Sequence, residues 1–307
     1  MLDVLFNAVL PVFAVVAVGF AFGRLGPFDF PTAAAINRFV FFAALPLLLF
    51  RLIATSPFEQ YEWSLVAAFL LTELIVYVAG YYVARRVFGR SWGESLLLGM
   101  SVAFANQVFF VLPIARQLYG DEGALPVVAI STFDVIVLLA GTIIILDVNR
   151  EQARDFSLSQ AARVFIRNPP ILGISAGVIA SLTGLPVIGG LEFFTRFVGE
   201  TAAPCSLFAL GVILATRRDE GSIAVPATFS ALKLVLAPIV AWLLVFAVFD
   251  VSPQWSNPAM LVAAGPAGAM PFVLALQYEI PVAAIARTIL ISTVGSLVTV
   301  TAITQIV

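Results

Sequence analysis

The sequence predicts an all-α membrane protein with ten transmembrane helices, arranged as two inverted repeats of five helices each. Three observations lead to this fold class. The composition is 61% hydrophobic and 11% charged, with a mean hydropathy of +1.06, whereas soluble domains carry about 25% charged residues. Apolar segments of spanning length follow one another along the whole chain. Two pairs of these segments also share sequence at nearly the same offset.

A helix crosses the hydrocarbon core of a bilayer with about 20 mostly apolar residues. Ten segments meet this requirement, at roughly residues 4–22, 33–54, 63–84, 93–118, 124–147, 169–187, 195–216, 224–249, 257–278 and 282–305. The longest connector, residues 149–168, is the most polar and separates a first repeat (1–148) from a second (169–307). The N-terminus lacks a basic region and a small-residue cleavage site, so we expect no removable signal peptide.

The arginines predict how the chain is oriented in the membrane. The connectors on one side carry most of them, namely Arg24, Arg85, Arg86, Arg90, Arg150, Arg154, Arg163, Arg167, Arg217 and Arg218. On the other side only Arg51, Arg116 and Arg196 occur, all near span ends. Because positive residues collect on the cytoplasmic side, the first side is predicted to be cytoplasmic. Ten spans in the cell inner (plasma) membrane then place both termini on the extracytoplasmic side.

The repeats are visible in two matched stretches. Residues 38–50 read RFVFFAALPLLLF and residues 196–208 read RFVGETAAPCSLF, with seven of thirteen positions identical at an offset of 158. The triplet Ile-Ser-Thr at 130–132 recurs at 291–293, an offset of 161. Spans two and five therefore correspond to spans seven and ten. Five spans per repeat make the second repeat inverted, which is typical of secondary transporters.

The fourth and ninth spans, which are repeat mates, carry the strongest interruptions. Span four reads AFANQVFFVLP, with Asn106, Gln107 and Pro113, and span nine contains the run GPAGAMP at 265–271. Pro113 and Pro271 are also 158 residues apart. Proline disrupts a helix, and irregular backbone at membrane depth is tolerated only where it is buried in protein or lines a cavity. We therefore expect broken crossover helices, although a pair of kinked packing helices is the plainer alternative.

Broken helices in matching positions predict a binding site near the middle of the membrane. Their exposed N-terminal ends carry partial positive charge, which suits an anion. The predicted substrate-binding residues are Asn106, Gln107, Phe109, Pro113, Pro266, Gly268 and Pro271. Asn106 is the first choice, and Gln107 is expected to point about 100° away from it around a helix. Phe109 either walls the pocket or only packs.

Several motifs give the chain a resemblance to the auxin efflux carrier family. They include AFANQVFFVLPIA, LYGDEGALPVVAIST, RNPPILGISAGVI, ETAAPCSLFALGVILA, SALKLVLAPIVAWLL and GPAGAMPFVLALQYEIP. Relatives often have small residues between the Asn and the Pro of the first motif, where this chain has bulkier ones. The resemblance implies a scaffold of spans one, two, six and seven that forms a homodimer. It further implies a transport domain of spans three to five and eight to ten that moves in an elevator-like cycle.

Ionisable residues deep in a membrane are costly and usually functional. Glu73 lies in span three, Asp134 in span five and Lys233 in span eight, and Ser131 and Thr132 precede Asp134 by less than one turn. These five residues are the predicted coupling or ion-binding group. Asp134 either carries a coupling proton, helps to bind a cation, or pairs with a buried base for stability. Lys233 either attracts the anion, neutralises Glu73, or extends to the cytoplasmic interface.

These features predict a secondary transporter of a small organic anion, with a carboxylate as the first choice, that is coupled to H⁺ or Na⁺ or is a uniporter. The same architecture would serve a sodium-coupled carrier of the bile-acid transporter class. A channel or an intramembrane enzyme is a weaker alternative. The chain has no His and one Cys, so no His-dependent triad or Cys/His metal site is expected. No cofactor and no nucleic-acid partner are predicted, because neither a P-loop nor a basic run occurs.

Overall fold

The computed structural model describes residues 10–150, 168–216 and 222–306. In these ranges every regular element is helical, and the single β-bridge joins two irregular segments. The predicted all-α membrane fold class is confirmed at this level. The predicted connector lies almost wholly outside the described residues, as do its arginines at 154, 163 and 167.

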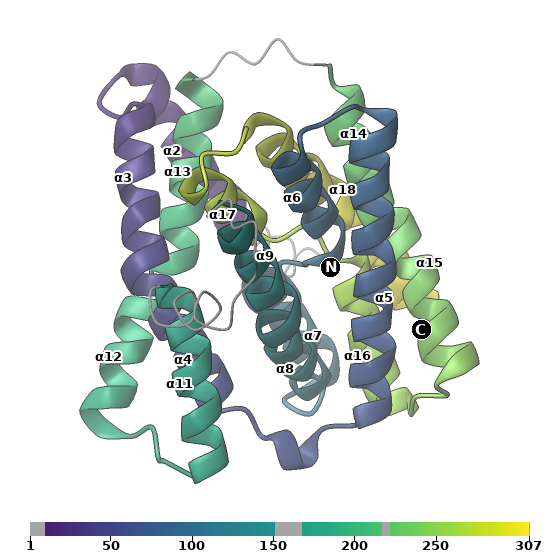
Figure 1. The fold of residues 1–307 in the computed structure, drawn as a ribbon. Coiled ribbons are helices and arrows are strands. Elements are labelled where there is room, and N and C mark those ends of the chain that lie inside the picture. The colour runs from purple at the N-terminus through teal and green to yellow at the C-terminus, as the bar shows by residue number, and fades with distance from the viewer. Residues whose placement is uncertain (1–9, 151–167, 217–221, 307) are drawn as a thin grey trace.

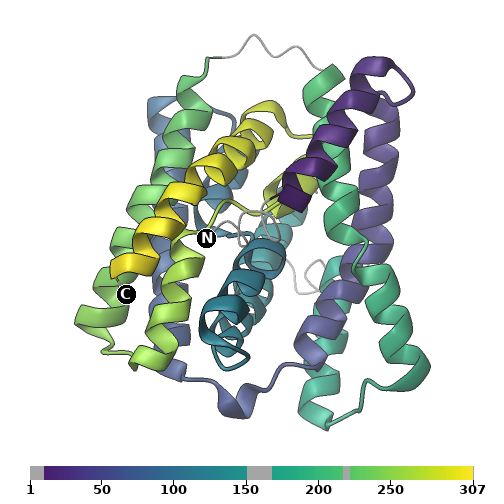
Figure 2. The same ribbon diagram turned by 180° about the vertical axis from the view of Figure 1, so that it is seen from behind.

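A first group of helices forms one side of the molecule, on the left in Figure 1 and on the right in Figure 2. It consists of α2 (Leu10–Leu25), α3 (Phe30–Phe39), α4 (Leu45–Ala54), α11 (Pro169–Thr183), α12 (Gly189–Gly199) and α13 (Ala202–Thr216). A π-helical turn at Val40–Ala44 joins α3 to α4. Glycines allow α2 to pack closely on α13, and α4 on α11. A Cβ atom added to Gly177 of α11 would lie 2.9 Å from the Phe50 carbonyl oxygen.

The second group contains the helices on the other side of the molecule and those in its middle (Figure 1). Its first half comprises α5 (Trp63–Tyr82), α6 (Trp92–Ala103), α7 (Leu112–Tyr119), α8 (Ala124–Phe133) and α9 (Ala140–Arg150). Its second half comprises α14 (Ala224–Ala231), α15 (Ala237–Trp242), α16 (Pro253–Ala264), α17 (Met270–Gln277) and α18 (Ala283–Ile306). The π-helical turns in this group lie at Val83–Val87, Gln107–Val111, Asp134–Leu139, Leu232–Leu236 and Leu243–Val248.

Six continuous helical segments in the described ranges are long and apolar enough to cross a membrane: Phe30–Ala54, Trp63–Val87, Ala124–Asn149, Gly189–Thr216, Ala224–Val248 and Ala283–Ile306. Two further apolar helices, Phe13–Leu25 and Pro169–Thr183, are shorter. The remaining two predicted spans, 93–118 and 257–278, are each divided into two short helices. These divisions fall in the two regions where the sequence predicted interruptions.

Candidate functional site

The two divided helices meet at their interruptions. The irregular segments run antiparallel and form a bridge with each other. The backbone N–H of Asn106 donates to the Pro266 carbonyl oxygen at 2.9 Å, and that of Gly268 donates to the Phe104 carbonyl oxygen at 2.8 Å. Each break thus supplies the partners that the other lacks, which a buried backbone inside a bilayer requires.

Side chains satisfy further backbone groups beside this pairing. The Lys233 ammonium group lies 3.5 Å from the Ala103 carbonyl oxygen, at the C-terminal end of α6. Thr299 donates its hydroxyl to the last carbonyl oxygen of α16 at 2.8 Å. Ser292, in the recurring Ile-Ser-Thr triplet, accepts from the Ala267 N–H at 3.1 Å. Two helical segments of the second half, Ala224–Val248 and α18, therefore contribute these contacts to the interruptions.

Gly268 is required by the close approach of the two segments. A Cβ atom at this position would lie 2.9 Å from the Ala105 carbonyl oxygen and 3.0 Å from Cδ1 of Phe104. The first distance is shorter than real Cβ contacts with backbone allow. Glycine therefore lets the two backbones come close enough to exchange hydrogen bonds.

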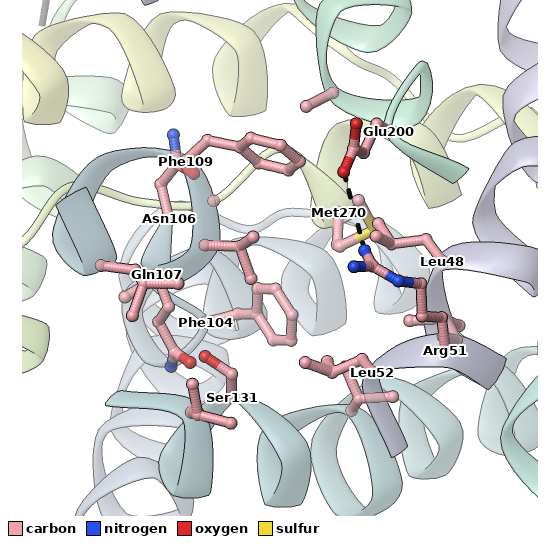
Figure 3. A pocket seen from close by; sticks show the side chains of 18 of the residues that line it. Leu48, Arg51, Leu52, Phe104, Asn106, Gln107, Phe109, Ser131, Glu200 and Met270 are labelled. Atoms are coloured by element: carbon pink, nitrogen blue, oxygen red, sulfur yellow. Dashed lines mark ion pairs between the residues drawn. The ribbon is translucent and has the colours of Figure 1, made fainter. Parts of the chain in front are cut away.

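A cavity of about 640 Å³ lies beside the paired segments, between the two helix groups (Figure 3). Its wall from the first group comes from α4 and α13, and its wall from the second group comes from the interruptions and α8. Five of the predicted site residues line it: Asn106, Gln107, Phe109, Ser131 and Gly268. Most of the other lining side chains are apolar, among them Leu48, Leu52, Phe104 and Met270.

The first turns of two helices begin at this cavity. Gln107 opens the π-helical turn that continues into α7, and Met270 opens α17, and both residues line the cavity. The residues that precede these turns make no side-chain hydrogen bond to them. Because the first N–H groups of a helix lack acceptors within it, both helix starts offer donors and partial positive charge to an anion.

The two neighbouring amides point in different directions. Figure 3 shows the Asn106 amide directed away from that of Gln107, which extends toward Ser131. The Gln107 amide nitrogen donates to the Asp134 carboxylate, and the side chain is 4% exposed. Asn106 is half-buried. Asn106 is therefore the amide that can turn to a ligand, whereas Gln107 is held by the cluster behind the cavity wall.

That cluster consists of Gln107, Asp134, Glu73 and Lys233, which come from four different segments of the second group. Glu73, Asp134 and Lys233 are all buried, close enough for their charges to act on one another. One oxygen each of Glu73, Gln107 and Asp134 is buried without a hydrogen-bond partner among the described residues. Lys233 is 1% exposed, so the alternative in which it extends to the interface is wrong.

The remaining predicted residues lie near the cavity but do not line it. Pro271 occupies the first turn of α17, where a missing N–H costs little. Pro113 lies in α7, directly after the π-helical turn Gln107–Val111. The first break ends at Asn106, well before Pro113, so this proline follows the interruption. Pro266 contributes its carbonyl oxygen to the backbone pairing. Thr132 is fully buried and its hydroxyl lies 2.8 Å from that of Ser56.

Two charged residues that the sequence did not assign to the site line its other wall. Arg51 lies in the last turn of α4, and its Nη1 lies 3.6 Å from Oε1 of Glu200, which follows α12 (Figure 3). One signal was available, because Arg51 is one of few arginines on the arginine-poor side. Its nearness to the interruptions, however, depends on how the two helix groups pack.

The chain is similar to known transporters over nearly its whole length. The model of a family described as "Membrane transport protein" matches residues 4–304. A protein of Rhizobium meliloti (strain 1021) that is named as a candidate malonate transporter is 27% identical, over 97% of this chain and 94% of its own. Uncharacterized transporters of Methanothermobacter thermautotrophicus and Methanocaldococcus jannaschii are 25% and 22% identical, each over 95% of both chains.

Proposed function

Because the chain belongs to this membrane transport protein family, the auxin efflux carrier family that its motifs indicate, we propose that it is a secondary transporter of a small organic anion. The observation that carries the proposal is the cavity at which two interrupted helices begin, with Asn106 beside them. Helix starts provide N–H donors and partial positive charge without a mobile side chain. A carboxylate is the anion that such a site suits, in agreement with the name of the Rhizobium relative.

The proposed architecture is ten spans in two inverted repeats, residues 1–148 and 169–307, with the two interrupted helices as crossover helices. The first helix group is the proposed scaffold, through which two copies form a dimer. The second group is the proposed transport domain. This group contains the buried charged residues, the two paired interruptions and several long hydrophobic helices, which pack together. Such packing supports movement of the group as a unit in an elevator-like cycle.

The position of the cavity supports a state open to the extracytoplasmic side. The cavity is lined by Thr55 and Asp121, which follow the ends of α4 and α7 on the arginine-poor side. Toward the opposite side, Asn37 of α3 donates to the Val273 carbonyl oxygen of α17 at 3.1 Å. This bond joins the two helix groups, and we propose that it breaks when the transport domain moves.

Coupling is proposed to use a proton held between Glu73 and Asp134. Two neighbouring buried carboxyl groups repel each other when both are charged, and one shared proton removes this repulsion. A cation such as Na⁺ would instead need oxygen ligands from several sides, and the Lys233 charge acts on both carboxyl groups. A positive side chain in this position opposes a second cation, so H⁺ is favoured over Na⁺.

Uptake into liposomes tests the function. We expect the reconstituted protein to take up radiolabelled malonate with saturation and to show counterflow, whereas a channel would show neither. Asn106→Ala should lower uptake about tenfold or more, since a hydrogen bond to a charged group contributes about 1.5–3 kcal/mol. Gln60→Ala, which removes an exposed amide outside the cavity, is the control. Normal transport by a folded Asn106→Ala variant would contradict the proposed site.

The coupling ion is tested in the same vesicles. A proton gradient directed into the vesicles, with the outside more acidic, should drive accumulation of malonate. An Na⁺ gradient in the same direction should not. Asp134→Asn should abolish accumulation driven by the pH gradient while counterflow continues, because exchange needs no net proton movement. Accumulation that follows Na⁺ alone would favour the sodium-coupled alternative of the bile-acid transporter class.

A further inference from the structure

Arg51 is the guanidinium group of the first helix group that lines the cavity, and it faces the interrupted helices across an apolar gap. Figure 3 shows its side chain directed into the cavity from α4, opposite Asn106 and Gln107, with Leu52, Phe104 and Met270 between. Polar groups thus lie beside the helix starts and at Arg51, with apolar side chains between them, and Arg116 and Asp121 of the second group also line the cavity. A ligand that matches this pattern carries two polar ends joined by a short apolar link.

The contacts of the Arg51 guanidinium group with the neighbouring glutamates are long. Its Nη1 lies 3.6 Å from Glu200 and its Nη2 lies 3.9 Å from Glu192, and both distances exceed those of hydrogen bonds. Its Nε is buried and has no hydrogen-bond partner among the described residues. The two glutamates keep the guanidinium in place electrostatically, and its N–H fork stays available for a carboxylate, which it fits in a bidentate manner.

We propose that Arg51 binds the second carboxylate of a short dicarboxylate whose first carboxylate lies at the helix starts beside Asn106. This inference rests on the proposed function and narrows its substrate class from organic anions to dicarboxylates. Arg51 is then the residue that distinguishes a dicarboxylate from a monocarboxylate of the same shape. The guanidinium N–H groups of Arg51 bind the second carboxylate of the substrate. A monocarboxylate has an uncharged group in that place and would leave the guanidinium without a bound anion.

Glu200 has a defined part in this arrangement. Its side chain is 58% exposed and follows the end of α12, so it can turn away to solvent. A substrate carboxylate that reaches Arg51 competes with Glu200 for the same guanidinium group. Glu200 thus acts as an internal carboxylate that occupies Arg51 when no substrate is bound and lowers the affinity for dicarboxylates.

Calorimetric titration of the purified full-length protein with malonate and with malonamate, its monoamide, tests the proposal. The two probes have the same shape and differ by one charge. The wild-type protein should bind malonate about tenfold or more tightly than malonamate, the effect of a charge-assisted hydrogen-bonded pair. Arg51→Gln should bring the affinity for malonate down to that for malonamate and leave malonamate unchanged, which also shows that the variant is folded. Arg51→Lys should lose part of the preference, because it keeps the charge without the fork.

Arg196→Gln is the matched control. This arginine pairs with the same Glu192 at 3.4 Å but does not line the cavity, so its loss should leave the preference for malonate intact. Glu200→Gln should tighten malonate binding severalfold without changing malonamate, and this arm stands even where Arg51 variants do not fold. The inference is overturned when Arg51→Gln keeps the wild-type ratio of the two affinities, or when Glu200→Gln leaves malonate binding unchanged. Failure of the wild-type protein to bind either probe would overturn the proposed function instead.

Discussion

Replacing Lys233 with methionine removes the positive charge from the buried cluster at little change in side-chain length. Lys233 is 1% exposed, and Glu73 and Asp134 are 4% and 1% exposed, so water cannot replace the lost charge. Its contact to the Ala103 carbonyl oxygen is 3.5 Å long and contributes little. The electrostatic loss therefore dominates. Breaking a buried ion pair from one side costs about 3–5 kcal/mol.

The free energy of unfolding is best measured with two probes, because the two helix groups carry different reporters. The four tryptophans all belong to the second group or its connectors: Trp63, Trp92, Trp242 and Trp255. The sole cysteine, Cys205, lies half-buried in α13 of the first group. Tryptophan fluorescence and a thiol-reactive dye, followed during heating in detergent, therefore report on the two groups separately. At about 2–4 °C per kcal/mol, Lys233→Met should lower the tryptophan transition by roughly 6–20 °C.

A second variant separates charge from packing. Adding Glu73→Gln to Lys233→Met removes one of the two carboxylates, so the double variant should recover part of the loss, with a coupling of about 0.5–3 kcal/mol. Val235→Met controls for a methionine in the same π-helical turn, because Val235 is 56% exposed. The reasoning is refuted if Lys233→Met unfolds at the wild-type temperature, or if the double variant is less stable than Lys233→Met.

Four further variants examine backbone packing and capping. Gly211→Ala in α13 should destabilise the protein by about 1–3 kcal/mol, since the added Cβ would lie 2.8 Å from the Phe20 backbone nitrogen. Gly141→Ala has open space around the added Cβ and should be neutral or stabilising. Thermal unfolding measures both variants. Gly268→Ala should impair malonate uptake because its Cβ would separate the paired breaks, and uptake at the wild-type rate would contradict the pairing. Asp29 caps α3, and hydrogen bonds from the hydroxyl and then the backbone N–H of Thr32 lower the pKa of its carboxyl group. The charged cap should therefore stabilise α3 fully above about pH 3.9, the pKa of an unfolded Asp. This stabilisation should be lost as the pH falls through the lower pKa of the folded state. Unfolding of Asp29→Asn should lack this pH dependence, and an identical pH profile in both proteins would contradict it.

Much of the fold class could be read from local sequence. Whether a segment can lie in hydrocarbon depends on its own composition and length, and 61% hydrophobic residues leave few alternatives. The interruption of the predicted fourth and ninth spans was also visible, because glycine and proline act on the backbone of their own segment. The position of the first break was less accurate. It ends at Asn106, well before Pro113, because the backbone partners at Pro266 and Gly268 come from the other helix.

The composition of the site depended on packing. Gln107 contacts Asp134, and Lys233 approaches Ala103, across 27 and 130 residues of sequence, and nothing in either local pattern chooses these partners. Arg51 illustrates the same limit, since it lies in a helix whose own sequence indicates only a span end. Hydrophobicity determines that a helix enters the membrane. The rotation of each helix and the approach of its neighbours determine which polar side chains meet there, because every buried polar group must find its partners among the helices that happen to pack against it.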